Sequence, residues 1–284
     1  MGKSIYKVSK ELQEIIIEDY KNNVSIRKIS EKYDVTRPTV SKFLEEKGIK
    51  TTKGNHYRIY HHNESFFDII DTEEKAYWLG FMFADGYIVD ESEHYGQDKF
   101  GISLAEQDKK TLEDFAKAIQ SNNPICVYSR KDNIGQPLCR ILLTSQKTVD
   151  DLIKHGCVKQ KSLILQPPID VPQNLTRHFI RGFFDGDGSI SRVLKQNKSQ
   201  EYWYSINITS TYEMIEWIYN FFEMGSIIKE KRRDKTYYYS LGGHRQVIKF
   251  FHILYDNATI YMERKYNRFL EFVEKYDENW GIKV

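Results

Sequence analysis

Two aspartates stand in matching surroundings in the two halves of this sequence. Residues 77–88 read YWLGFMFADGYI and residues 179–190 read FIRGFFDGDGSI, with Asp85 and Asp187 at equivalent positions. Carboxylate oxygens are preferred ligands of hard divalent cations such as Mg²⁺. Such a cation can activate water, stabilise a leaving oxygen and neutralise a phosphate, so the pair is suited to phosphodiester hydrolysis.

Small residues recur four positions apart in both copies of this motif. Gly80 and Ala84 form one pair, and Gly182 and Gly186 form the other. Residues i and i+4 share a helix face, and faces without large side chains let two helix backbones approach closely. The spacing therefore predicts two helices packed against each other.

The two aspartates should lie at the C-terminal ends of these helices. Packing the helices together brings the two anions near each other and near the negative ends of the helix dipoles. A divalent cation would relieve this repulsion. We expect the following Gly86 and Gly188 to adopt the left-handed conformation that often ends a helix.

The segments after each motif also correspond. Each half is predicted to run helix, two strands, helix, two strands, helix, over about residues 73–166 and 173–284. Three prolines, Pro167, Pro168 and Pro172, make a stiff connection between them. A duplicated unit in one chain predicts a pseudo-twofold axis that relates the halves.

The spacing of apolar residues predicts that residues 1–55 form a separate module of three short helices. A polar linker over residues 56–72 would join it to the rest of the chain. Ser25 and Thr36 are suited to cap the second and third helices. The spacing is typical of a helix-turn-helix, although a plain three-helix packing module stays open as an alternative. Four residues are predicted on the exposed face of the recognition helix: Arg37, Thr39, Ser41 and Lys42.

Both motif copies resemble the LAGLIDADG motif of homing endonucleases, and the resemblance extends over about residues 73–275. It implies an α+β fold of two pseudo-twofold-related αββαββα halves, preceded here by the small all-α helix-turn-helix domain. The strands would form a saddle over the DNA major groove, with cleavage across the minor groove near the axis. The catalytic acid at the eighth motif position corresponds to Asp85 and Asp187. At the sixth position Asp185 has Phe83 as its counterpart, so it is not predicted to bind metal.

The resemblance also implies a metal site. We expect the carboxylates of Asp85 and Asp187 and the backbone oxygens of Ala84 and Gly186 to bind Mg²⁺. Mn²⁺ can substitute, whereas Ca²⁺, with its looser geometry, should support DNA binding with little cleavage.

Family members usually place a basic residue near the centre, and the matching residues here are Lys161 and Lys265, with Lys159 as a competitor to Lys161. A solvated surface lysine is the alternative for each. Polar residues that order water near the metals would correspond to Glu106, Gln107, Ser210 and Thr211.

The strands after each motif should carry the base contacts. Arg and Lys are suited to guanine and phosphate, and Gln to adenine. The candidates are Gln97, Lys99, Arg130, Lys131, Arg140, Arg192, Lys195, Gln196, Lys198, Lys231, Arg232, Arg233 and Lys235. Most of them are expected to contact phosphate or remain solvated.

Composition excludes several other classes of protein. The formal net charge is only +2, which argues against coating of nucleic acid over the whole surface. The sequence has three cysteines, Cys126, Cys139 and Cys157, and their spacing is not that of a metal site. We therefore expect neither a zinc site nor a disulfide framework. No apolar stretch is long enough to span a bilayer and no secretory signal is present, so we expect a cytoplasmic protein.

The resemblance therefore implies a monomeric, site-specific homing endonuclease that cuts both strands of a long, roughly pseudo-palindromic DNA site. The gene product is expected to be free-standing or intron-encoded. Two alternatives stay open on the same fold: a DNA-binding transcription regulator that does not cleave, and an intron maturase that assists RNA splicing.

Overall fold

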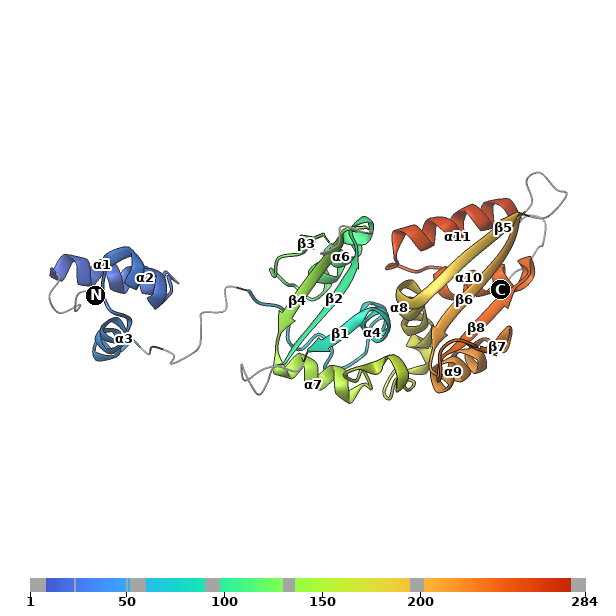
Figure 1. The fold of residues 1–284 in the computed structure, drawn as a ribbon, viewed down its shortest axis with the longest axis horizontal. Helices are drawn as coiled ribbons and strands as arrows, with labels where there is room; N and C mark the ends of the chain where they lie inside the picture. Colours follow the sequence, from blue (N-terminus) through green and yellow to red (C-terminus); the bar gives the residue numbers. More distant parts are fainter. Residues whose placement is uncertain are drawn as a thin grey trace. The chain divides into compact units, whose positions relative to one another are not determined.

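The computed structural model describes residues 9–22, 24–49, 51, 60–89, 98–129, 136–194 and 202–276. The chain divides into two compact units, Met1–His61 and His62–Val284 (Figure 1). None of the described helices has the length and apolar character needed to cross a bilayer. All three cysteines are free; Cys126 is exposed, and Cys139 and Cys157 are buried.

The described residues of the first unit form three helices, α1 (Lys10–Lys21), α2 (Ile26–Tyr33) and α3 (Arg37–Glu46). Ser25 caps α2 as predicted, since its hydroxyl accepts a hydrogen bond from the Lys28 amide at 3.2 Å. Thr36 stands at the N-cap of α3, but its hydroxyl contacts the Thr39 hydroxyl and makes no capping bond. The unit has its own core, formed by Ile16, Tyr20, Ile29, Val35, Val40, Phe43 and Leu44.

The second unit contains two halves with the same order of elements, which confirms the predicted α+β fold. The first half runs α4 (Glu73–Ala84), β1 (Gly86–Val89), β2 (Lys99–Ala105), α6 (Lys109–Ala118), β3 (Cys126–Tyr128), β4 (Leu138–Thr144) and α7 (Gln146–Lys154). The second runs α8 (Thr176–Asp187), β5 (Gly188–Leu194), β6 (Tyr202–Ser210), α9 (Tyr212–Phe222), β7 (Ser226–Lys229), β8 (Tyr237–Gly242) and α10 (His244–Tyr255). A further helix, α11 (Glu263–Tyr276), follows it, and short 3₁₀ turns lie at η2 (Glu106–Asp108), η3 (Lys161–Leu163) and η4 (Gln173–Leu175).

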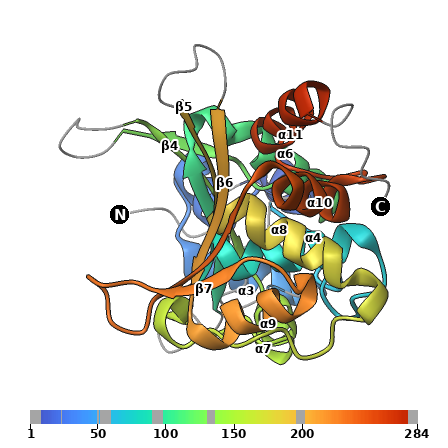
Figure 2. The ribbon, with the colours of Figure 1, turned by 90° about the vertical axis from the view of Figure 1, so that its right-hand side faces the viewer.

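Each half contains one antiparallel four-stranded sheet, and the strand orders correspond. They are β1-β2-β4-β3 and β5-β6-β8-β7. Alternating residues such as Phe100 and Ile102 in β2, and Ile206 and Ile208 in β6, point into the core. Helices α4 and α8 lie side by side between the sheets (Figure 1), with α10 and α11 on one side of the pair and α7 and α9 on the other (Figure 2).

Glycines allow α4 and α8 to pack backbone against backbone. A Cβ at Gly80 would lie 2.0 Å from the Phe179 carbonyl oxygen, and one at Gly182 would lie 1.9 Å from the Tyr77 carbonyl oxygen. The two contacts are equivalent under the pseudo-twofold relation of the halves. The predicted close packing of the motif helices is confirmed.

The prediction for Gly86 and Gly188 was wrong. Neither is among the positive-φ glycines of the described chain, and Gly188 is extended, with φ −81° and ψ 154°. Each helix passes directly into a strand, so no left-handed residue is needed. Glycine is required instead by close approach, because a Cβ at Gly86 would lie 2.5 Å from the Met82 carbonyl oxygen and one at Gly188 2.1 Å from the Phe184 ring.

The helix contact leads to a stability prediction. Gly80→Ala places a methyl group against the backbone of α8, which cannot move without disturbing both halves, so the free energy of unfolding should fall by about 3 kcal/mol. Gly242→Ala, at a site where a Cβ meets no atom within 4 Å, is the matched control and should change it little. Urea unfolding of both variants measures the difference. Equal stabilities for the two variants would contradict the close packing.

Candidate active site

The paired helices bring Asp85 and Asp187 to the same end of the interface. Asp85 is the C-cap of α4, and Asp187 is the last residue of α8. Between them, Gly186 faces the other motif: a Cβ there would lie 2.3 Å from the Ala84 Cβ and 3.4 Å from the Asp85 Oδ2. The small residues thus allow both acids to approach the pseudo-twofold axis.

The surroundings of the two acids favour their protonated forms. Burial raises the pKa of Asp85, and nearby Lys265 and Lys161 oppose this rise. Burial and then the charge of Asp85 raise the pKa of Asp187 to about 6, against the same two lysines. Although protein atoms crowd around Asp187, part of the residue is exposed and lines a cavity. Water and ions can therefore reach it.

Hydrogen bonding separates these acids from the third acid of the motif. Asp185 is fully buried and accepts hydrogen bonds from Tyr77 Oη at 2.9 Å, Tyr255 Oη at 2.6 Å and the Met262 amide at 2.7 Å. Within the described residues, the carboxylates of Asp85 and Asp187 have no hydrogen-bond donor. Asp185 is satisfied by the protein, whereas the other two have free oxygens.

Lysines approach the two motif ends at equivalent positions. Lys161 Nζ donates to the Gly86 carbonyl oxygen, and Lys265 Nζ donates to the Gly188 carbonyl oxygen at 2.6 Å. Lys265 is only 4% exposed, and burial lowers its pKa to about 8. The competitor Lys159 is 2.8 Å from the buried carboxylate of Asp98, an ion pair away from the motif.

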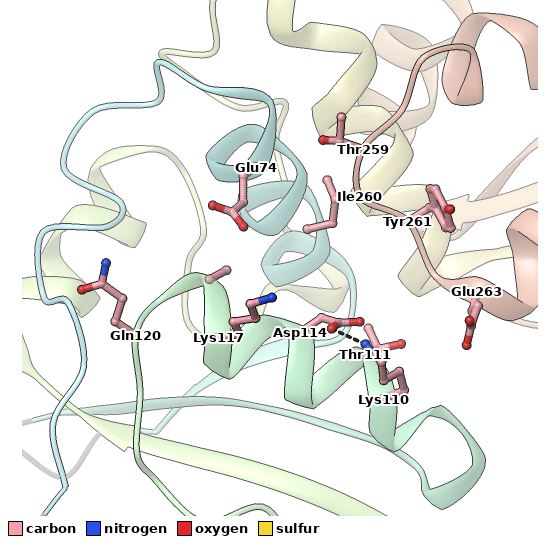
Figure 3. Close-up of a pocket in the computed structure, with 11 residues that line it drawn as sticks. Glu74, Lys110, Thr111, Asp114, Lys117, Gln120, Thr259, Ile260, Tyr261 and Glu263 are labelled. Atoms are coloured by element: carbon pink, nitrogen blue, oxygen red, sulfur yellow. Dashed lines mark hydrogen bonds and ion pairs between the residues drawn. The ribbon is translucent and has the colours of Figure 1, made fainter.

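A cavity of about 690 Å³ opens at this end of the interface and is lined by Asp187, Lys161 and Ser210, among others. Another cavity of about 720 Å³ lies between α6 and residues 259–263 (Figure 3) and contains none of the predicted site residues. Its Lys110 and Asp114 pair with each other. The first cavity is therefore the candidate site, because it alone of the two contains a motif acid.

The other polar residues predicted near the metals lie in different settings. Glu106 and Gln107 are exposed in η2, and Ser210 lines the cavity. Thr211 is buried and structural: its hydroxyl donates to the Leu165 carbonyl oxygen at 2.5 Å and accepts from the Met214 amide at the start of α9.

The predicted DNA contacts lie on strands and loops of both halves. Lys99 begins β2; Arg140 is exposed on β4, with its guanidinium carbon 5.5 Å from the centroid of the Tyr128 ring. Arg192 is exposed on β5 and lies 3.9 Å from Glu271. The exposed loop before β8 carries Lys231, Arg232, Arg233 and Lys235. Six candidates fall outside the described residues: Gln97, Arg130, Lys131, Lys195, Gln196 and Lys198.

The predicted recognition helix α3 presents its four residues unequally. Arg37 and Lys42 are exposed. Thr39 and Ser41 are half-buried, and their hydroxyls contact the Thr36 carbonyl oxygen at 2.8 Å and the Thr51 hydroxyl at 3.0 Å. The charged pair is therefore the part of α3 most accessible to a partner.

Sequence reasoning missed a buried polar network beside the site. Arg181 is fully buried and donates to Glu73 Oε1 at 2.7 Å, to the Leu254 carbonyl oxygen at 2.8 Å and to the Ile260 carbonyl oxygen at 2.9 Å. Burial, and then the charge of Arg181, lowers the pKa of His178 to about 4. The available signal was an arginine inside the otherwise apolar run FIRGFF.

The oxygen atoms at this site suit a hard divalent cation that is bound partly by the protein and partly by a ligand. Asp85 and Asp187 have free carboxylate oxygens, but no group of three His, Cys, Asp or Glu residues gathers anywhere in the described ranges. Of the two predicted backbone ligands, the Gly186 oxygen also lies 3.5 Å from Lys265 Nζ. A cation here would need phosphate and water oxygens to complete its coordination.

Comparison with known families identifies the second half directly. Residues 180–276 match the family model described as LAGLIDADG endonuclease. These residues form a LAGLIDADG domain. The first half repeats its order of elements and its sheet topology around the equivalent motif.

Solved LAGLIDADG meganucleases share this fold. One lysine-to-alanine mutant of the meganuclease I-SmaMI aligns with a TM-score of 0.50 and 15% identity, over 75% of this chain and 93% of that one. Another aligns with a TM-score of 0.50 and 16% identity, over 72% and 92% of the two chains.

A curated relative is the replication factor C small subunit of Methanocaldococcus jannaschii, 27% identical over 223 residues. The alignment covers 75% of this chain but only 11% of that protein. This chain therefore corresponds to a small part of that relative.

The raised pKa of Asp187 predicts a pH-dependent stability. The folded state binds its proton more tightly than the unfolded chain, so this contribution to stability is present at low pH and is lost as the pH rises through about 6. Asp187→Asn removes the titrating group. In chelator, the variant should unfold at a higher temperature than wild type near pH 7, and the advantage should shrink near pH 4.

Asp170→Asn, at an exposed position in the connection between the halves, is the matched control and should give no such pH-dependent difference. Thermal unfolding across the pH range provides the measurement. An Asp187→Asn advantage that stays constant with pH would contradict the assignment.

Proposed function

We propose that this protein is a site-specific endonuclease that hydrolyses both strands of double-stranded DNA with a divalent cation, preferably Mg²⁺. The observation that carries this proposal is the pair of carboxylates, Asp85 and Asp187, that meet at the ends of paired LAGLIDADG helices with no hydrogen-bond donor among the described residues. Unpaired anions in a partly buried site are costly unless a ligand compensates them. The match of residues 180–276 to a LAGLIDADG endonuclease model supports the same reaction.

Each residue of the site has a distinct part in this proposal. The free oxygens of Asp85 and of Asp187 would each serve a centre that faces one DNA strand, where they would hold a cation whose shell phosphate and water oxygens complete. Bound there, a divalent cation lowers the pKa of water and neutralises the phosphate. Lys161 and Lys265 keep two positive charges beside the acids, which lessens the repulsion between the acids and an approaching phosphate.

The duplex would lie along the outward faces of the two sheets. Lys99 and Arg140 lie on the first sheet, and the loop with Arg232 and Arg233 belongs to the second. Because the halves bind successive segments, the site should be long and only roughly pseudo-palindromic. One chain supplies both acids, so a monomer is sufficient for cutting two strands.

The two alternative functions would use the same surface without cleavage. A transcription regulator or a maturase gains nothing from two acids whose burial raises their pKa values and whose oxygens accept no hydrogen bond from the part of the chain that the structure describes. The unpartnered acids therefore favour the nuclease. Incubation with the native locus and Mg²⁺ distinguishes the three, since only a nuclease yields cut DNA.

Asp85→Asn and Asp187→Asn should each abolish double-strand cleavage, reducing its rate at least about 100-fold, because each removes a charge that holds the cation. Binding of the intact site in Ca²⁺ should persist or improve, since one anion near the phosphates is gone. Plasmid cleavage in Mg²⁺ and Mn²⁺, with gel shifts in Ca²⁺, measures both effects.

Asp170→Asn is again the control and should cut like wild type. Nicking of one strand by either motif variant is compatible with two separable centres. Full double-strand cleavage by Asp85→Asn or Asp187→Asn would rule out the proposed mechanism.

We further propose that the first unit adds DNA affinity through the exposed charges of α3. Replacing Arg37 and Lys42 together by Ala should weaken binding and reduce the slope of log affinity against log salt by about 2, since two fewer phosphates are neutralised. Replacing Lys21 and Lys28, exposed on α1 and α2, is the control of equal charge and should change the slope less. Fluorescence anisotropy over a salt series tests this, and equal slopes for both double variants would count against α3.

A further inference from the structure

The two motif ends differ most at one buried position. Asp185 of α8 corresponds to Phe83 of α4, so a carboxylate in one half stands where the other half has an apolar ring. Both residues are fully buried. A buried carboxylate must be satisfied by donors, and its donors show which segments it holds together.

The donors to Asp185 come from three separate segments. Tyr77 lies on α4 of the first half, Tyr255 ends α10, and Met262 directly precedes α11. Their donor atoms lie 2.9, 2.6 and 2.7 Å from the carboxylate oxygens. Asp185 therefore ties the start of α11 to the motif helices.

Helix α11 in turn carries the lysine that holds the end of α8. Lys265 lies in its first turn and donates to the carbonyl oxygens of Phe184, Asp185 at 2.7 Å and Gly188 at 2.6 Å. These carbonyls flank Asp187 on both sides. The contacts form a closed loop: the Asp185 side chain holds α11, and α11 holds the backbone that presents Asp187.

In the described residues around Asp85, no buried carboxylate has the role of Asp185. Phe83 supplies no acceptor, and among the described residues Lys161 Nζ donates to a single carbonyl oxygen, that of Gly86. Lys161 begins the three-residue turn η3; Leu163 at its end and the following Ile164 are 53% and 56% exposed, and the segment returns to the core at Leu165. Lys265 is instead anchored by a helix whose Phe269 and Phe272 are buried in the core.

We propose that Asp185 is a positioning residue for one cleavage centre only: through Met262 and Lys265 it fixes the backbone that presents Asp187. The inference rests on the proposed nuclease function. It makes the two centres unequal: the Asp187 centre is held in place by a buried network that includes a carboxylate, whereas the Asp85 centre is held by the Lys161 contact to Gly86 and the Cys157 thiol contact to the Met82 carbonyl oxygen. The strand whose cutting requires Asp187 is therefore the strand that depends on Asp185.

A merely structural role for Asp185 has a different consequence. Loss of the buried bonds would then lower the stability of the whole second unit, and both strands would be cut more slowly to the same degree. Comparison of the two strands separates these cases. The strands are defined by the nicking preferences of Asp85→Asn and Asp187→Asn on a site labelled at either end.

The variant for the test is Asp185→Asn, which keeps the size of the side chain but turns an NH₂ group toward one of the three donors. Under conditions where it is folded, it should slow cutting of the Asp187-dependent strand by about tenfold or more and the other strand by less than about threefold, because small displacements of reacting groups cost large factors in rate. Phe83→Leu, at the equivalent position of α4, is the matched control and should show no strand preference. Equal slowing of both strands by Asp185→Asn would overturn the proposal.

Hydrogen exchange on the free protein in chelator provides a second measurement that needs no nuclease activity. Asp185→Asn should speed amide exchange in residues 184–190 and 262–268 more than in residues 82–88. If Asp185→Asn does not fold, Tyr255→Phe removes one of the three bonds and should produce a smaller change in the same segments. Absence of DNA cleavage by wild type would refute the proposed function alone, whereas uniform or unchanged exchange would refute the positioning role.

Discussion

Backbone contact between α4 and α8 is the constraint on which the rest of the second unit depends. Gly80 and Gly182 leave no room for a Cβ against the facing helix, so the two motifs pack backbone against backbone. The packing joins two halves that each have their own sheet, and it determines the separation of the helix ends. Any larger separation of the helices would move Asp85 and Asp187 apart.

The same closeness creates an electrostatic cost. Two acids lie at the negative ends of two helices, and burial and mutual repulsion raise the pKa of Asp187 to about 6. Lys161 and Lys265 offset part of this cost, since both lower the pKa values of the two acids, and both also bind carbonyl oxygens of the motif ends. The remaining cost is what a cation and a phosphate would relieve, so the strain of the free site favours ligand binding.

Pseudo-symmetry is kept in the helix contact and in the strand order but not in the buried polar residues. Asp185, Arg181 and His178 of α8 correspond to Phe83, Leu79 and Ala76 of α4. The polar side chains of α8 find partners in Glu73, Tyr255 and the segment before α11, all of them buried or half-buried. Two copies of one unit in a single chain can diverge in this way. Each copy has its own residue at an equivalent position, and that residue has to fit only the neighbours in its own half.

The order of elements, the duplication, the helix contact and the two motif acids could all be predicted from the sequence, because period, small-residue spacing and repetition are local patterns. The left-handed glycines were predicted wrongly, since local preference does not reveal that each helix runs straight into a strand. Only the tertiary structure decided which acid is satisfied, which lysine is buried and where Arg181 finds its partners. The physical reason is that hydrogen-bond satisfaction and burial depend on residues far apart in the chain: the donors to Asp185 come from Tyr77, Tyr255 and Met262.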